Sequence, residues 1–391
     1  MRLAQRMERI GESATLKVMR LAGELRAQGM EVLDLGVGEP DFPSPPPAVE
    51  AAREALSAGY TKYSEASGLP ALRNAVAAAL ASRYGALWTG RDVVVTAGAK
   101  MALFDLALVL LEPGDEAVIP SPCWVSFPEQ VRFAGAEAVL VPTSGADRFE
   151  IHAEALIAAF TPRTRAVILN SPANPTGGII SAADLRRVTE ACAERGIALV
   201  ADETYDRFFY PGPVPFASAA SLSREFPETV VLVGSMSKTY SMTGWRLGYV
   251  CGPPSVIRAV QAIQSHSTSN ATTFAMKGAE TALAEGEPFV AAMIEEFRQR
   301  RDLLIEGLNA LPGVRCLPPA GAFYAFPDVS GAFRPGRADS TELAEHLLRK
   351  AGVAVVPGAA FGSDLHVRMS FACSRETLEK ALARMAEALA S

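Results

Sequence analysis

The stretch VVLVGSMSKTYSMTGWRLG, residues 230–248, decides the interpretation of the fold. It opens with an apolar run that ends at Ser235, and Lys238 follows directly, which is typical of a buried strand leading into a functional loop. The middle of the chain repeats this pattern between helical stretches, at DVVVTAG (92–98), EAVIPS (116–121), EAVLVPT (137–143), RAVILNSP (165–172) and IALVADE (197–203). Because these runs are apolar without strict alternation, they predict an α/β fold, a mostly parallel central sheet with helices on both faces.

The character of the sequence changes near residue 285. Long amphipathic helices follow, for example over 297–311 and 340–352, with short strands at 321–326 and 366–372 and a terminal helix. This pattern predicts a smaller α+β domain. We therefore expect an amino-terminal arm with part of the small domain at 1–45, a large domain at 46–284 and a small carboxyl-terminal domain at 285–391.

Composition excludes several classes of protein. Of the 391 residues, 49% are hydrophobic and 20% charged, as in ordinary soluble proteins. The net charge of -6 without a basic run argues against a nucleic-acid partner, and no apolar window is long enough for a membrane helix. Since the start lacks a secretory signal pattern, we expect a cytoplasmic protein. Five widely spaced cysteines indicate reduced core thiols, and with four scattered histidines we expect no metal site.

Residues 235–248, SMSKTYSMTGWRLG, resemble the cofactor-lysine signature of the class I aminotransferases of the aspartate aminotransferase fold. Six further stretches stand in that family's order and spacing: LGVGEPDF, TKYSEASG, SPCWVSFPE, NSPANPTG, ADETY and GVAVVPG. Seven such matches in register are specific. The resemblance implies fold type I of the pyridoxal-phosphate enzymes, a homodimer, and an aminotransferase that holds its cofactor as a Schiff base on Lys238 and works by a ping-pong mechanism.

Lys238 and Asp202 suit this chemistry on physical grounds as well. Desolvation lowers the pKa of an amine, so a lysine at a strand end becomes a nucleophile toward an aldehyde and then a base at the substrate α-carbon. A carboxylate that closes the apolar run 197–201 needs a partner, and a protonated pyridine nitrogen is a suitable one. By resemblance, Tyr205 and Asn174 bind the phenolic oxygen of the cofactor. The alternative for Lys238 is a surface lysine without a functional role. The alternative for Asp202 is a helix cap or a member of a buried ion pair.

A phosphate site is expected where a strand turns into a helix at Gly98, Ala99 and Lys100, because a helix amino terminus attracts anions. The resemblance adds Ser235 and Arg246 to this site. It also implies that Tyr63 reaches the phosphate of the neighbouring subunit.

Substrate binding is predicted around Arg368, whose planar guanidinium lies between apolar residues and can hold an α-carboxylate through two hydrogen bonds. A structural ion pair is the alternative role. By resemblance, Gly38 and Asn174 assist it, and Trp124 stacks on the cofactor ring. Cys123 stands where close relatives often carry tyrosine. The bonds Ser121-Pro122 and Asn174-Pro175 are candidates for cis peptides.

The side-chain pocket is assigned by resemblance to bacterial aspartate aminotransferases, which carry Ser-Ala-Thr near the amino terminus and a lysine at the start of the phosphate helix. Here these are Ser13, Ala14, Thr15 and Lys100. A lysine beside hydroxyl groups suits the distal carboxylate of a dicarboxylate, which is unfavourable in a closed site without a partner. Aspartate with 2-oxoglutarate is therefore expected, with prephenate or aromatic amino acids as alternatives.

Three other functions compete. A β-lyase, decarboxylase or oxidase would use the same Lys238 and Asp202, because fold does not fix chemistry. Arg368 together with Lys100 favours two carboxylates and hence transamination. An effector-binding domain on the same scaffold predicts a fused DNA-binding segment or a lost lysine, and a nicotinamide dehydrogenase predicts G-x-G-x-x-G. Neither pattern is found.

Overall fold

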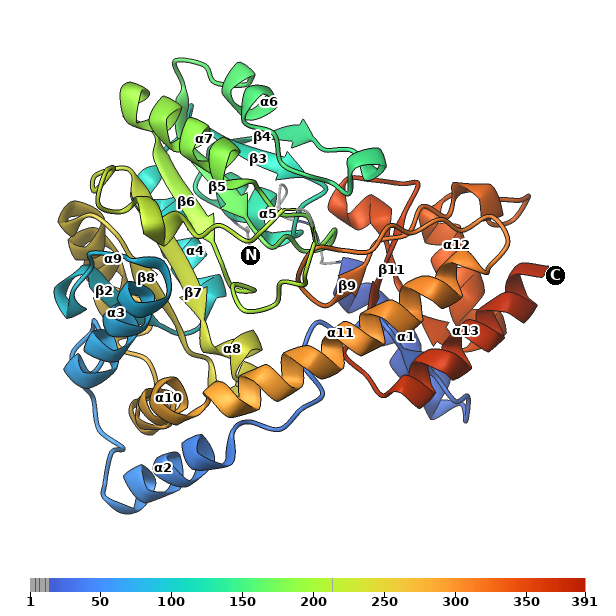
Figure 1. Ribbon diagram of the computed structural model, residues 1–391, viewed down its shortest axis with the longest axis horizontal. Helices are drawn as coiled ribbons and strands as arrows, with labels where there is room; N and C mark the ends of the chain where they lie inside the picture. Colours follow the sequence, from blue (N-terminus) through green and yellow to red (C-terminus); the bar gives the residue numbers. More distant parts are fainter. Residues whose placement is uncertain (1–3, 5–6, 8–10, 12–13, 213, 391) are drawn as a thin grey trace.

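A seven-stranded sheet forms the centre of the molecule, as shown by a computed structural model that describes residues 4, 7, 11, 14–212 and 214–390 (Figure 1). The strand order is β2-β8-β7-β6-β5-β3-β4, and β8 alone runs antiparallel to its neighbours. The strands are β2 (Val93–Thr96), β3 (Glu116–Ser121), β4 (Glu137–Pro142), β5 (Thr164–Asn170), β6 (Ala198–Asp202), β7 (Val230–Ser235) and β8 (Gly248–Cys251). The mostly parallel sheet is thus confirmed, although β8 was not expected from the sequence.

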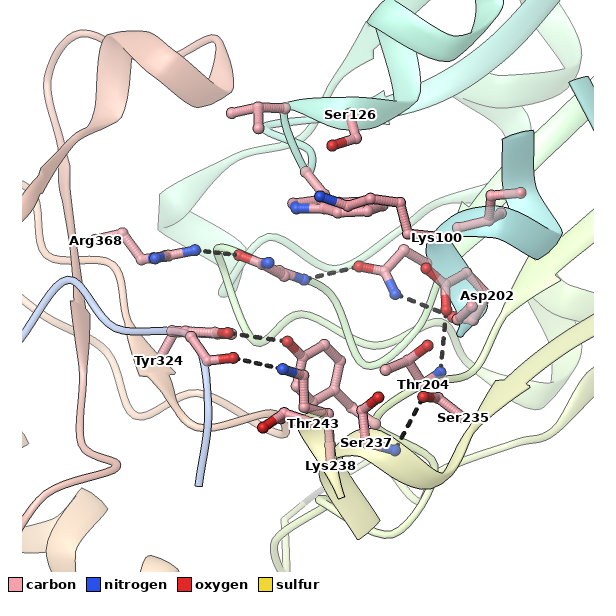
Figure 2. A pocket seen from close by; sticks show the side chains of 18 of the residues that line it. Lys100, Ser126, Asp202, Thr204, Ser235, Ser237, Lys238, Thr243, Tyr324 and Arg368 are labelled. Atoms are coloured by element: carbon pink, nitrogen blue, oxygen red, sulfur yellow. Dashed lines mark hydrogen bonds between the residues drawn. The ribbon is translucent and has the colours of Figure 1, made fainter. Parts of the chain in front are cut away.

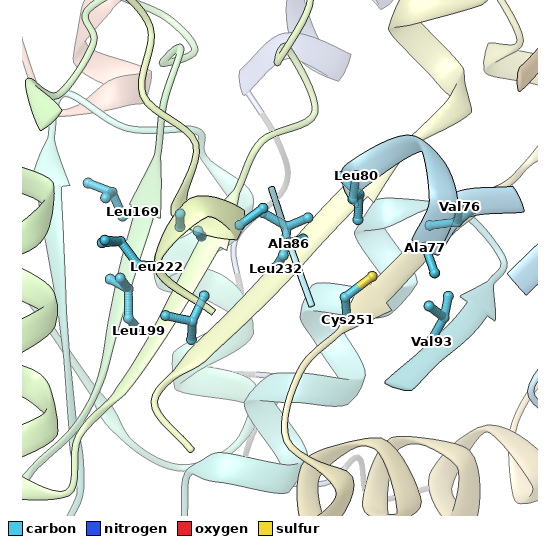
Figure 3. Close-up of a cluster of buried hydrophobic side chains, with 14 of the residues drawn as sticks. Val76, Ala77, Leu80, Ala86, Val93, Leu169, Leu199, Leu222, Leu232 and Cys251 are labelled. Carbon is cyan, nitrogen blue, oxygen red and sulfur yellow. The ribbon is translucent and has the colours of Figure 1, made fainter. Parts of the chain in front are cut away.

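Helices cover both faces of this sheet, which explains the continuous apolar runs. Val93 and Val95 of β2 belong to one cluster, with residues of α3, α7 and α10, whereas Val94 belongs to a second cluster, with residues of α4, α5 and α9. Figure 3 shows part of the first cluster, with Leu199 and Leu232 of the sheet among its side chains. The helices are α2 (Pro46–Ser57), α3 (Pro70–Tyr84), α4 (Ala99–Leu110), α5 (Ser126–Phe133), α6 (Ala153–Ala158), α7 (Ala182–Arg195), α8 (Met236–Thr239), α9 (Pro254–His266) and α10 (Thr273–Glu285).

The carboxyl-terminal part builds a separate hydrophobic cluster beside the large sheet. The 23-residue helix α11 leads from one part of the molecule to the other (Figure 1). Two short sheets, β1-β10 and β11-β12-β9, lie in this part, so that residues 33–34 near the amino terminus pair with residues 353–354. Its elements are α1 (Ala14–Ala27), β1 (Leu33–Asp34), α11 (Glu287–Asn309), β9 (Tyr324–Ala325), α12 (Ser340–His346), β10 (Val353–Ala354), β11 (Val356–Pro357), β12 (Val367–Ser370) and α13 (Arg375–Ala390).

Three further observations concern the whole described part of the chain. All five cysteines are free thiols, and four of them are buried. Among the described residues, no helix is long and apolar enough to cross a membrane. The same residues contain no group of three or more histidine, cysteine or acidic side chains that could hold a metal ion.

Candidate active site

One pocket collects most of the residues that the sequence singles out. It lies at the carboxyl ends of β5, β6 and β7, beside the start of α4, which is where ligands bind in open α/β sheets. Strands β9 and β12 close it from the other part of the molecule, so Tyr324 and Arg368 face Lys100 and Asp202 across the cavity (Figure 2). Its volume of about 400 Å³ is typical of small-molecule sites.

Lys238 projects into this pocket from α8, the single turn after β7. Its ammonium group donates a hydrogen bond to the carbonyl oxygen of Gly38, which belongs to the segment between β1 and α2. Burial lowers the pKa of Lys238 to about 8, an effect that Glu39 opposes and Arg368 reinforces. Since the neutral amine is the nucleophile, this lysine is prepared to react with an aldehyde near neutral pH.

Asp202 is the last residue of β6 and is 5% exposed. One carboxylate oxygen accepts a hydrogen bond from the amide of Thr204 at 3.1 Å, and no described residue forms an ion pair with it. Burial therefore raises the pKa of Asp202 to about 6. A buried carboxylate of this kind, which faces a cavity and has no ion-pair partner among the described residues, is complementary to a protonated nitrogen of a ligand.

The start of α4 forms a cradle for an anion. Gly98 precedes the helix with φ of 86°, a conformation that favours glycine, and the amides of Met101 and Ala102 bond back to its carbonyl oxygen. The amides of Ala99 and Lys100 thus precede the first helical hydrogen bonds, as in phosphate sites at helix ends. A Cβ atom at Gly98 would lie 2.6 Å from a guanidinium nitrogen of Arg246, so glycine is required here for close approach.

Ser235, the last residue of β7, and Arg246, from the connection that follows this strand, complete the cradle. Arg246 donates to the carbonyl oxygen of Thr243 at 2.8 Å, and the Ser235 hydroxyl accepts from the amide of Ser237 at 3.0 Å. All four side chains line the pocket. Residues 235–246 thus carry two potential anion ligands and Lys238.

Arg368 is 3% exposed and reaches the pocket from β12. One terminal nitrogen donates to the side-chain oxygen of Asn174 at 3.1 Å, and the other donates to the carbonyl of Gly36 at 2.7 Å. Its Nε has no hydrogen-bond partner among the described residues. A buried guanidinium that lines a cavity and has no ion-pair partner among the described residues is suited to a carboxylate of a ligand.

Aromatic side chains form the remaining walls. Lys100 places its ammonium group 5.0 Å from the ring centre of Trp124, a cation–π arrangement, and both line the pocket. The hydroxyl groups of Tyr205 and Tyr324 are hydrogen bonded at 2.9 Å. Cys123, next to Trp124, is buried, and burial raises the pKa of its thiol to about 12.

Four predicted residues are not among those that line this pocket, and one of them, Gly98, directly precedes the lining residue Ala99. Tyr63 is 89% exposed and lines no part of it. Ser13 lies outside the described residues, and for Thr15, in the first turn of α1, the description covers the backbone only. The predicted cis peptides at Ser121-Pro122 and Asn174-Pro175 are confirmed, and a third occurs at Ser171-Pro172.

The pocket also contains residues that the sequence reasoning missed. Asn170 closes β5, donates to the carbonyl of Asp202 at 3.0 Å and accepts from the amide of Asn174 at 2.8 Å. It was recognisable as a polar residue at a strand end. Tyr324 sits inside the apolar strand GAFYAF, where its hydroxyl was the available signal. Ser126 begins α5 and Thr243 begins a short 3-10 helix, and neither carried such a signal.

Comparisons with known proteins agree over nearly the whole chain. Residues 30–385 match the sequence family described as aminotransferase class I and II. A probable aspartate/prephenate aminotransferase of Aquifex aeolicus is 42% identical, covering 99% of this chain and 98% of that protein, and an aspartate aminotransferase of Geobacillus stearothermophilus is 42% identical over 98% of each. Among solved structures, the aspartate aminotransferase of Thermus thermophilus with maleate superposes with a TM-score of 0.93 at 42% identity, covering 99% of this chain and 100% of that one.

Proposed function

The chain belongs to the class I and II aminotransferase family, and from this premise we propose that it moves the amino group of aspartate to 2-oxoglutarate by a ping-pong mechanism. Its cofactor is pyridoxal phosphate. Bound in the pocket, this cofactor supplies an aldehyde and an electron-withdrawing ring that make the α-proton of an amino acid acidic. The observation that carries the proposal is the convergence of Lys238, Asp202 and Arg368 on one cavity.

The residues present fit this cofactor. Asp202 offers a buried carboxylate without an ion-pair partner, which suits the ring nitrogen, and the start of α4 with Arg246 suits the phosphate. Trp124 offers an aromatic face for stacking, and Tyr205 and Asn174 offer hydrogen bonds to the phenolic oxygen. These assignments follow the family motif residue by residue.

The proton transfer is assigned to Lys238. With its pKa lowered to about 8 by burial, its amine is neutral in a useful fraction of molecules near neutral pH and can accept the α-proton. With the cofactor bound, the protonated Nζ of Lys238 would then be the acid that donates this proton to the carbon of the former aldehyde group. Gly38 holds the amine in position through its carbonyl oxygen when no ligand is bound.

Two of the four cationic side chains that line the pocket support a dicarboxylate substrate. Arg368 is assigned to the α-carboxylate, because it lines the pocket without an ion-pair partner among the described residues, and Lys100 lies across the cavity beside Trp124. The Thermus thermophilus relative was solved with maleate, itself a dicarboxylate. Ser13 and Thr15 remain part of the proposed pocket for the distal carboxylate.

Prephenate is a second candidate substrate, because the Aquifex aeolicus and Thermus thermophilus relatives are named for both aspartate and prephenate. Prephenate also carries two carboxylates, so Arg368 and Lys100 suit it equally. Its ring requires more room beside Trp124 than aspartate does.

We also propose a homodimer in which Tyr63 enters the active site of the neighbouring subunit. Its side chain is 89% exposed in the single chain, an unusual position for a tyrosine, and apolar residues Met101 and Phe104 line an open hollow beside Lys100 and Arg246. Mixing Lys238→Ala and Tyr63→Ala subunits should restore activity, because each hybrid has one intact site. Activity no greater than the sum of the two variants contradicts this arrangement.

The proposed location is the cytoplasm, where a reducing environment suits five free thiols.

An absorbance titration tests the reaction. The purified protein, supplied with pyridoxal phosphate, is mixed in turn with L-aspartate, L-phenylalanine and L-alanine, and the loss of visible absorbance is followed. We expect aspartate to act at the lowest concentration. Bleaching by another amino acid alone would retain an aminotransferase and refute the dicarboxylate assignment. A protein that binds no pyridoxal phosphate would refute the enzyme assignment.

A further inference from the structure

Tyr324 links two functional residues that come from different parts of the fold. It lies in β9, is 1% exposed, and lines the pocket opposite Asp202 (Figure 2). Its hydroxyl is 2.9 Å from that of Tyr205, which follows β6 in the large sheet. The two phenol rings meet edge to face at 5.9 Å, so this contact is fixed by packing as well as by the hydrogen bond.

The other face of Tyr324 supports the carboxylate-binding arginine. The guanidinium carbon of Arg368 lies 4.5 Å from the centre of its ring. Strands β9 and β12 are paired with Tyr324 opposite Ser370, so Arg368, two residues before Ser370, is a diagonal neighbour of Tyr324. A Cβ atom at Gly38 would lie 3.0 Å from the Tyr324 hydroxyl, so the backbone that accepts from Lys238 also adjoins this hydroxyl. Tyr324 therefore lies next to three groups of the site: the Gly38 backbone that binds Lys238, the guanidinium of Arg368 and the hydroxyl of Tyr205.

The direction of the hydrogen bond between the tyrosines follows from proton counting. Each hydroxyl has one proton to donate. If Tyr205 donates its proton to the phenolic oxygen of the cofactor, it can only accept from Tyr324. A hydroxyl that accepts one hydrogen bond becomes a stronger donor in the next, so Tyr324 strengthens the contact that Tyr205 makes. The charged groups that influence Tyr205 are Arg368 and Asp202.

We propose that Tyr324 is a positioning residue for the transamination site, with its hydroxyl directing the proton of Tyr205 toward the cofactor and its ring setting the plane of Arg368. This inference rests on the proposed function. It differs from the family motif, since Tyr324 belongs to none of the stretches that carry the resemblance.

The first test separates the hydroxyl from the ring with Tyr324→Phe. The readout is the pH midpoint of the visible absorbance change of the protein loaded with pyridoxal phosphate. The phenolic oxygen carries more negative charge in the high-pH form, so a weaker donor at Tyr205 disfavours that form. We expect the midpoint to rise by about 0.5 pH unit. Binding of maleate, measured by the same absorbance, should change less than about twofold because the ring is retained.

The second test removes the ring with Tyr324→Leu, which should weaken maleate binding about fivefold through loss of the support under Arg368. Tyr210→Phe is the matched control, because it also deletes a buried hydroxyl, one that donates to the carbonyl of Ala322 at 2.8 Å outside the pocket. This control should leave both the midpoint and the maleate affinity unchanged.

A double variant guards against general loss of structure. In a Tyr205→Phe background, Tyr324→Phe should cause no further shift of the midpoint, because the hydroxyl acts through Tyr205. Two results would overturn this inference and leave the proposed function standing. One is a midpoint shift from Tyr324→Phe that is as large in the Tyr205→Phe background as in the wild type. The other is an unchanged midpoint in the single variant Tyr324→Phe while the wild type titrates normally. A wild-type protein that binds no pyridoxal phosphate overturns the proposed function and this inference with it.

Discussion

Replacing Lys100 by glutamine should change the preference for substrates more than the rate of catalysis. Lys100 lines the pocket next to Trp124 and faces Arg368, so it is placed to meet the distal carboxylate of aspartate. Two opposite charges 4 Å apart interact by about 1 kcal/mol in water and by about 4 kcal/mol near a protein surface. Because the lysine is only partly buried, we take about 2 kcal/mol, or roughly a 30-fold effect.

The assay compares kcat/KM for L-aspartate and L-phenylalanine in the wild type and in Lys100→Gln. We expect the value for aspartate to fall roughly 30-fold and that for phenylalanine to change little, since phenylalanine has no distal carboxylate. Lys350→Gln, which changes an exposed lysine far along the chain, is the control and should alter neither value. Equal losses for both amino acids in Lys100→Gln would refute the pairing with the distal carboxylate and point to a role in holding the cofactor.

Three other variants test the roles of Lys238, Asp202 and Glu203. Lys238→Ala should lower kcat by at least about 10²-fold in steady-state assays, and near-normal turnover would contradict its role as base. Asp202→Ala should retain binding of pyridoxal phosphate, measured by absorbance, but lose single-turnover rate; an unchanged rate argues against contact with the ring nitrogen. Glu203 accepts hydrogen bonds from the Ser218 hydroxyl and the amide of Ala219, and burial raises its pKa to about 8 from the ordinary glutamate pKa of 4.5. Between these two pH values the folded protein therefore keeps a proton on Glu203 that the unfolded chain releases. This group should therefore lower the free energy of unfolding of the wild type as pH rises from 4.5 to 8. In urea unfolding, the free energy of unfolding of Glu203→Gln should gain on that of the wild type by up to about 1.4 kcal/mol per pH unit over this range. Plots of the two free energies against pH that run parallel would contradict this.

The central sheet could be predicted from sequence because its strands are buried on both faces. Runs such as Val230 to Ser235 end at the residues where the structure ends the strand, since a polar residue marks the exit from the apolar layer. Strand β8 was missed because Gly248 and Tyr249 interrupt its apolar pattern. The limits of the domains at residues 45/46 and 284/285 stay a prediction.

The site could be predicted where a polar residue at the end of a strand is of the type that one specific chemical role requires. Lys238 and Asp202 meet this condition, and so does Asn170, which was overlooked. Tyr324 could not be found in this way, because a tyrosine in an apolar strand is interpreted as a core residue unless its contact with Tyr205 is known. Contacts between distant parts of the chain depend on the fold and leave no mark in local sequence.

The two halves of the active site differ in how far apart their parts lie along the chain. Lys238 and Arg246 share one connection between the neighbouring strands β7 and β8, and the cradle at Gly98 and the carboxylate of Asp202 precede them in the same sheet, whereas the partners of Arg368 stand 194 and 332 residues away from it. Contacts between sequence-distant residues close long loops and so tend to form late in folding. We expect refolding protein to regain pyridoxal phosphate binding before maleate binding, and simultaneous recovery in stopped-flow absorbance would show that both halves assemble in a single cooperative step.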